Sequence, residues 1–146
     1  MIWISKCLTG EKCRYDGGSR PNGEIVSRLA KGLEAVCFCP ECEAGLPTPR
    51  TPSEIVGGDG SDVLGGKAKV LTKDGKDRTE EFVRGAQLAL AAAKKAGVTA
   101  ALMKSKSPSC GVGCIYDGSF TGRLKAGSGV TAALFKENGI EVVEVD

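Results

Sequence analysis

Histidine is absent from the 146 residues of the chain. Its absence removes the most common general base and the most common nitrogen ligand of zinc. Acid–base chemistry must therefore fall to aspartate, glutamate, lysine, tyrosine or cysteine, and a metal site must be rich in thiolates. Thiolate-rich sites favour zinc, Cu(I) or iron–sulfur clusters.

The sequence also lacks long apolar runs, since no stretch approaches the roughly 20 residues that a helix needs to cross a bilayer. Residues 1–7 show no basic segment followed by an apolar one, so we expect no secretory signal peptide and a cytoplasmic protein. No linker and no low-complexity tract interrupts the chain. We therefore expect one domain over residues 1–146 and no membrane contact, while the oligomeric state stays open.

Charge is nearly balanced, with 20 Lys and Arg against 18 Asp and Glu. The net charge of +2 neither requires nor excludes a nucleic-acid partner. The chain contains seven cysteines. In a reducing compartment these indicate thiolate chemistry or metal binding rather than structural disulfides.

Apolar patterns typical of strands alternate with helical ones. The strands are expected at residues 2–4, 35–39, 69–72, 98–103 and 140–145, and the helices at 23–33, 79–96 and 128–135. Pro40 should end the second strand, Thr79 should cap the long helix and Gly97 should end it. The pattern predicts an α/β fold: a single-domain three-layer sandwich of the Rossmann or flavodoxin type. Its mostly parallel sheet would have about four strands, with a small hairpin before the long helix.

Three cysteines follow three of these strands. Cys7 comes after the first strand, Cys39 ends the second, and Cys110 lies beyond the strand at residues 98–103. Ligands of open parallel sheets bind outside the carboxyl ends of the strands, so the three thiols should converge. Three thiolates can hold a [4Fe–4S] cluster and leave one iron open. The alternative is that they are small buried apolar residues, which is the better interpretation of Cys37.

Other cysteine pairings suggest other functions. Cys39 and Cys42 form a Cys-x-x-Cys, typical of thiol–disulfide oxidoreductases or of half a zinc site. Cys110 and Cys114 could supply the other half, and the chain would then be a zinc-stabilised module that binds nucleic acid or protein. Cys7 would have no role in that site.

Two glycine-rich segments and one short repeated motif are further candidates for a binding site. Gly111 and Gly113 follow a polar loop, Ser105–Cys110, that could cradle an anion or contact a base edge, or could be an ordinary turn. Residues 127–129 resemble a phosphate loop only weakly. Cys-x-Tyr-Asp-Gly occurs at residues 13–17 and again at 114–118. These are two similar turns, or two parts of one pocket wall.

Taken together, these segments resemble a bacterial family, the TudS-like thiouracil desulfidases. The matching segments run through the chain in order: Cys7–Gly10, Cys13–Gly17, Cys39–Glu41, Gly45–Arg50, Ser107–Gly111, Ile115–Gly118 and Gly129–Ala133. The resemblance implies that Cys7, Cys39 and Cys110 bind a [4Fe–4S] cluster whose fourth iron has no protein ligand. It also implies that Glu41 and Ser107 are catalytic. Cys37, Cys42 and Cys114 look like departures from the family pattern, and Cys13 has no assigned role.

The resemblance implies non-redox hydrolysis of a thiolated pyrimidine, giving uracil or uridine and sulfide. Water would attack the ring carbon, with Glu41 as the base and Ser107 as a proton relay or ring contact. Without the resemblance, Glu41 reads more simply as the solvated start of a helix. The substrate could be 4-thiouracil, 4-thiouridine or thiolated tRNA. Six cations near the expected edge could contact phosphates or could be solubilising charges: Lys12, Arg14, Arg20, Arg50, Lys104 and Lys106.

Overall fold

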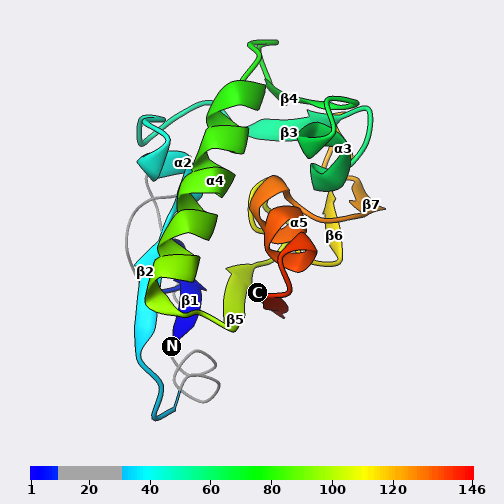
Figure 1. Ribbon diagram of the computed structural model, residues 1–146. Coiled ribbons are helices and arrows are strands. Elements are labelled where there is room, and N and C mark those ends of the chain that lie inside the picture. The colour runs from blue at the N-terminus through cyan, green and yellow to red at the C-terminus, as the bar shows by residue number, and fades with distance from the viewer. Residues whose placement is uncertain (10–30) are drawn as a thin grey trace.

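A computed structural model describes residues 1–9 and 31–146 of the chain (Figure 1). Four strands form one sheet, in the order β2 (Ala35–Phe38), β1 (Ile2–Ser5), β5 (Ala100–Lys104) and β8 (Glu141–Val145). Every neighbouring pair in this sheet is parallel. The predicted α/β class and four-stranded parallel sheet are confirmed.

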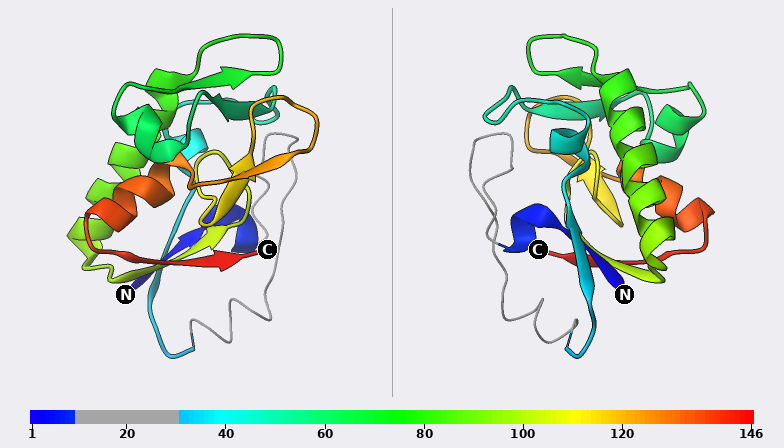
Figure 2. Two further views of the ribbon diagram at one scale, coloured as in Figure 1. Left: turned by 90° about the vertical axis from the view of Figure 1, so that its right-hand side faces the viewer. Right: turned by 60° about the vertical axis from the view of Figure 1, so that its left-hand side comes forward.

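Two helices cover one face of the sheet, α4 (Thr79–Ala96) and α5 (Val130–Glu137) (Figure 2). Trp3 of β1 and Met103 of β5 point into this layer and are fully buried. The ring of Trp3 packs edge-on against Phe135 of α5, with 5.2 Å between the ring centroids. Alternate residues of the strands thus supply the main core beneath the helices.

The opposite face carries a second buried cluster. Ile4, Leu102 and Val145 pack there with Leu8, which lies on the short 3₁₀ helix η1 (Lys6–Thr9). The helix predicted at residues 23–33 lies almost wholly outside the described residues.

Two antiparallel hairpins lie beyond the sheet. The first joins β3 (Ser53–Val56) to β4 (Lys69–Thr72), with the short helix α3 (Gly60–Leu64) between them. The second joins β6 (Cys114–Tyr116) to β7 (Leu124–Ala126). The sequence predicted a hairpin near β4, but β3, β6 and β7 were missed. The prolines at positions 47, 49 and 52 indicate a loop where β3 begins, and β6 and β7 have only three residues each, too few for a clear alternation.

The long helix α4 has the predicted bounds but not the predicted cap. The hydroxyl of Thr79 accepts a hydrogen bond from the Val70 amide at 3.0 Å, so it ties the helix to β4 instead of capping it. Asp77 accepts from the Thr79 amide at 2.9 Å. The helix ends at Gly97, whose φ of 71° is the left-handed conformation that glycine adopts readily, as expected. No helix in the described part of the chain is long and apolar enough to cross a membrane.

Helix α4 also meets α2 (Pro40–Glu43), the single turn that follows β2. The contact is so close that a Cβ added at Gly85 would stand 2.3 Å from the carbonyl oxygen of Pro40. Only glycine allows this approach. The start of α2 is therefore held by backbone packing against α4.

We expect Gly85→Ala to destabilise the protein by about 1–3 kcal/mol, because the methyl group must displace the backbone of α2. In an ordinary helix the same change stabilises by roughly 0.5–1 kcal/mol, so the sign is diagnostic. Urea unfolding of the variant measures it. Gly113→Ala is the matched control, since nothing lies within 4 Å of its added Cβ. Equal stability of Gly85→Ala and wild type would contradict the close contact.

Candidate active site

A cavity of about 870 Å³ opens at the edge of the sheet where the parallel strands end. Its wall includes Ser5 at the end of β1, Cys39 after β2, Lys104 at the end of β5 and Asp146 after β8. Parallel strands all run toward the same edge, so four distant parts of the chain contribute to one cavity.

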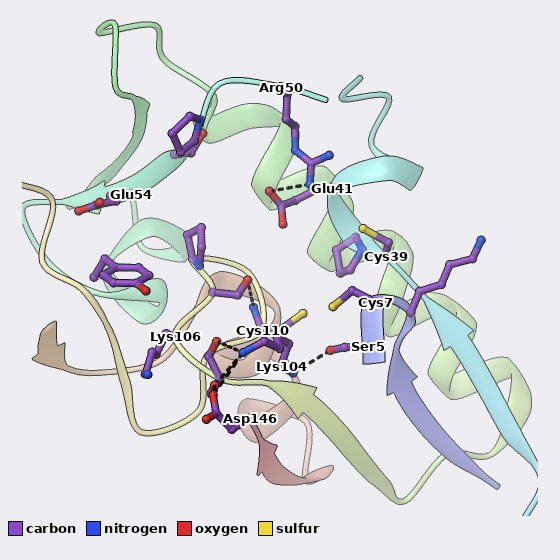
Figure 3. Close-up of a pocket in the computed structure, with 18 of the residues that line it drawn as sticks. Ser5, Cys7, Cys39, Glu41, Arg50, Glu54, Lys104, Lys106, Cys110 and Asp146 are labelled. Atoms are coloured by element: carbon purple, nitrogen blue, oxygen red, sulfur yellow. Dashed lines mark hydrogen bonds and ion pairs between the residues drawn. The ribbon is translucent and has the colours of Figure 1, made fainter. Parts of the chain in front are cut away.

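Cys7, Cys39 and Cys110 all line this cavity, and Figure 3 shows their sulfur atoms facing the same space. Cys7 belongs to η1, Cys39 joins β2 to α2, and Cys110 lies in the loop after β5. Cys39 and Cys110 are buried, with 8% and 5% of their surface exposed, and Cys7 is half-buried. The structure brings the three predicted cysteines together, while their role as ligands stays a prediction.

The loop that carries Cys110 is folded around Ser107. The Ser107 hydroxyl oxygen accepts hydrogen bonds from the amides of Ser109 and Cys110, each at 3.1 Å. Its carbonyl oxygen accepts from the Gly111 amide at 2.8 Å. These bonds leave the hydroxyl proton of Ser107 available to another acceptor, and the residue lines the cavity.

The same loop is anchored to the start of α5. The amide of Val130 donates to the carbonyl oxygen of Pro108 at 2.8 Å, and the amide of Thr131 donates to that of Ser109 at 2.9 Å. The buried hydroxyls of Ser109 and Thr131 are 2.9 Å apart. The first amides of the helix are thus satisfied by the loop. They are not left to bind an anion, which argues against the phosphate-loop interpretation of residues 127–129.

Glycines make this anchoring possible. A Cβ at Gly129 would stand 2.5 Å from the carbonyl carbon of Ser109, and a Cβ at Gly60 of α3 would stand 2.2 Å from the carbonyl oxygen of Gly129. Gly60 also donates its amide to the carbonyl oxygen of Ser128 at 2.7 Å. Backbone therefore rests on backbone from α3 through the start of α5 to the loop of Cys110.

Burial raises the pKa of the Cys110 thiol to about 12. A hydrogen bond with the Ser5 hydroxyl opposes this effect, whereas the nearby charges of Cys39 and Glu41 add to it. Because burial dominates, Cys110 is a neutral thiol at neutral pH. A metal that binds it as a thiolate must displace a proton.

Glu41 enters the cavity from α2 and forms an ion pair with Arg50, whose Nη2 lies 3.2 Å from Oε1 of the glutamate. Both side chains are largely buried, with 18% and 8% of their surface exposed. Nη1 of Arg50 donates to the carbonyl oxygen of Pro47 and to the hydroxyl of Thr48, each at 3.1 Å. Burial alone would lower the pKa of Arg50, but the charges of Glu41, Cys39 and Cys42 raise it. Arg50 is therefore a fixed cation that holds the Glu41 carboxylate in place.

The other described cysteines lie outside the cavity wall. Cys37 is exposed on β2, so the prediction that it is a buried apolar residue is wrong. Cys42 faces Thr48, with 3.4 Å between its sulfur and the Thr48 hydroxyl, and burial raises its pKa. Cys114 begins β6. Cys13 lies outside the described residues.

The geometry gives little support to a zinc site on Cys39, Cys42, Cys110 and Cys114. In residues 1–9 and 31–146, which include Cys39, Cys42, Cys110 and Cys114, no three acidic, histidine or cysteine side chains could hold one metal ion together. A cubane places its irons at separate corners, so it suits thiols that stand further apart.

Some cations that the sequence placed near the edge have other partners. Arg50 pairs with Glu41, and Nζ of Lys104 lies 2.9 Å from the Ser105 hydroxyl and 3.5 Å from Asp146. Lys106 lines the cavity. Lys12, Arg14 and Arg20 lie outside the described residues.

Sequence reasoning missed a second group of cavity residues: Glu54, Tyr116 and Phe120. The turn at residues 114–118 had been weighed as a pocket wall, and Tyr116 does line the cavity. Its counterpart at residues 13–17 lies outside the described residues. No sequence pattern indicated that Glu54 and Phe120 line a site, because β3 and the β6–β7 hairpin that position them were not predicted.

Known proteins resemble this chain along almost its whole length. The sequence profile of a family described as 2-thiouracil desulfurase matches residues 2–146. A relative from Bacillus subtilis (strain 168), uncharacterized protein YbbK, is 48% identical over 143 residues, covering 98% of this chain and 94% of the relative. A solved structure described as the [4Fe-4S]-dependent thiouracil desulfidase TudS has a TM-score of 0.82 and 43% identity. That match covers 98% of this chain and 89% of TudS.

We expect Cys110 to resist alkylation in the metal-free protein at pH 8, while exposed Cys37 reacts. Only the thiolate reacts, and a pKa of about 12 keeps Cys110 protonated until the pH is far higher. Mass spectrometry after a timed pulse of iodoacetamide measures both sites. In urea the two should react alike, which is the control. Equal rates in the folded protein would contradict the burial of Cys110.

Proposed function

The chain belongs to the 2-thiouracil desulfurase family, and from this premise we propose that it is a [4Fe–4S]-dependent enzyme that hydrolyses thiolated pyrimidines. The observation that carries the proposal is the meeting of Cys7, Cys39 and Cys110 at one cavity in a chain with no histidine. The likeness to TudS, described as [4Fe-4S]-dependent, supports it at 43% identity.

The donor set fits such a cluster. Three thiols from three separate segments face the cavity, and thiolates are the usual ligands of iron–sulfur clusters. Cys110 is buried and needs a cation beside it to ionise, which iron would supply. Three ligands leave one iron of four without a protein ligand. When bound, the cluster would supply a Lewis acid for the thiocarbonyl sulfur of the substrate.

Glu41 is the proposed general base. Its carboxylate lines the cavity and is oriented by Arg50, so it can take a proton from a water molecule that attacks the ring carbon. Overall, C=S and water become C=O and hydrogen sulfide, so no electron enters or leaves.

Ser107 is proposed as the partner of Glu41. Its oxygen already accepts two amide hydrogen bonds, so its own proton points elsewhere and can be donated to the substrate ring or relayed. The two amides fix the position of the hydroxyl. Ser107 would therefore have two roles: it positions the loop of Cys110, and it donates or relays a proton in the reaction.

The substrate we propose is a small thiopyrimidine such as 4-thiouracil or 4-thiouridine. Arg50 and Lys104, two cations that could have served a nucleic acid, already bind Glu41 and the Asp146–Ser105 pair. Thiolated tRNA is thereby the weaker candidate. Steady-state turnover with the base, the nucleoside and the tRNA under matched salt ranks the three.

We expect each of Cys7→Ala, Cys39→Ala and Cys110→Ala to lose most of the cluster and at least a hundredfold in desulfuration, because two thiolates hold a cubane poorly. The assay is anaerobic reconstitution, then iron, sulfide and absorbance measurements, then release of sulfide from 4-thiouracil. Cys37→Ala is the matched control and should behave as wild type. Three variants that retain full iron content and turnover would refute the ligand set.

We expect Glu41→Gln to keep the cluster and lose about 10²–10⁴-fold in kcat, since removal of a general base costs that much. Iron content and kcat with 4-thiouracil are measured on the same preparation. Glu43→Gln is the control, because Glu43 lies on the same turn, is exposed, and does not line the cavity. Wild-type turnover in Glu41→Gln would remove Glu41 from the mechanism.

A further inference from the structure

The cavity has an aromatic wall that the proposed chemistry does not use. Tyr116 of β6 and Phe120 of the β6–β7 connection both line it, with Glu54 of β3. Aromatic residues make up only 5% of the chain, so two of them on one wall of the cavity are more than chance placement would be expected to give. Figure 3 shows Glu54 on the opposite side of the cavity from Cys7, Cys39 and Cys110.

Glu54 holds this wall in place. Its carboxylate is buried, with 9% of the residue exposed. Oε1 accepts hydrogen bonds from the amides of Gly118 at 2.9 Å and Phe120 at 3.2 Å. Among the described residues its partners are thus backbone amides of the β6–β7 connection. A buried carboxylate is costly unless it is hydrogen-bonded, so the connection and Glu54 depend on each other.

Phe120 is held in an unusual backbone conformation. Its φ of 58° is left-handed, which a bulky residue without special support rarely adopts. The amide of Phe120 is one of the two that Glu54 binds, so the carboxylate stabilises the strained residue itself. Such strain collects where a side chain must be presented in one direction. Here the direction is toward the cavity, which Phe120 lines.

We propose that Tyr116 and Phe120 form a stacking subsite for the planar pyrimidine ring of the substrate, and that Glu54 is its positioning residue. This inference rests on the proposed function and extends it to substrate recognition. A thiopyrimidine has two π faces and a polar edge. Stacking holds a face and leaves the edge, with its thiocarbonyl group, free to meet the cysteines across the cavity.

The test compares the affinities of uracil and 5,6-dihydrouracil for the cluster-loaded protein by calorimetry. The two compounds carry the same carbonyl and N–H groups in the ring, but only uracil is planar and aromatic. Wild type should prefer uracil by roughly tenfold, the usual scale of one stacked base. Phe120→Ala and Phe120→Leu should both bring the ratio close to one, and Phe120→Tyr should retain it.

Kinetics give a second measurement. Phe120→Ala should raise KM for 4-thiouracil by roughly tenfold and leave kcat within about twofold, with the cluster absorbance unchanged. Leu124→Ala is the matched control, since Leu124 is an exposed apolar residue of β7 that does not line the cavity. Its preference ratio and KM should equal those of wild type.

The role of Glu54 is tested by a graded pair of variants. Glu54→Gln keeps an oxygen that can accept both amides and should retain the preference for uracil. Glu54→Ala frees the connection and should lose it. The double variant Glu54→Ala/Phe120→Ala should lose no more than Phe120→Ala alone, because both act through one ring.

Two outcomes overturn the inference: equal binding of uracil and dihydrouracil by wild type, or an unchanged preference in both Phe120→Ala and Phe120→Leu. Failure of the proposed function looks different. A cluster-loaded wild type that prefers uracil but releases no sulfide from any thiopyrimidine would refute the desulfuration and leave the stacking subsite standing.

Discussion

Parallel pairing of β2, β1, β5 and β8 is the constraint on which the site depends. Strands that all run one way release the chain at one edge, so each following segment begins beside the others. Cys7, Cys39 and Cys110 are separated by tens of residues in the sequence, yet each leaves the sheet at this edge. Reversal of one strand would send its cysteine to the far end of the molecule. The convergence of the three cysteines therefore depends on the backbone hydrogen bonds that pair the strands in parallel.

The strand ends bring the groups near, and local contacts fix them. Ser107 folds the Cys110 loop through two amide hydrogen bonds, and α5 anchors it through Pro108 and Ser109. Arg50 fixes Glu41 from the proline-rich segment after α2. Glu54 does the same for the aromatic wall. In each case a buried polar group satisfies backbone or carboxylate partners, so the protein's own contacts hold the cavity residues in place.

The sequence predicted the parts of the fold that have strong periodicity or clear stops. The bounds of α4, the end of β2 before Pro40 and the four parallel strands follow from patterns of apolar residues, Pro and Gly. Prediction from the sequence failed where contacts between distant segments determine the local structure. The sequence indicated that Thr79 caps α4, but its hydroxyl binds the amide of Val70 on β4. No pattern near Phe120 indicates that its amide binds the carboxylate of Glu54, 66 residues away. For the site, the three cysteines could be placed by topology, whereas Glu41 and Ser107 came from family resemblance.

The stack of glycines from Gly60 through Gly129 to the Ser109 carbonyl has a consequence for how this chain can change over evolution. Because the Cys110 loop is seated on main chain, its position depends on the absence of side chains at Gly60 and Gly129 as well as on the packing of the core. A core residue can be exchanged for another aliphatic residue of similar volume at modest cost. The two glycines cannot, since any side chain would separate the layers. Mutational tolerance should therefore be lowest at residues that carry no functional group at all.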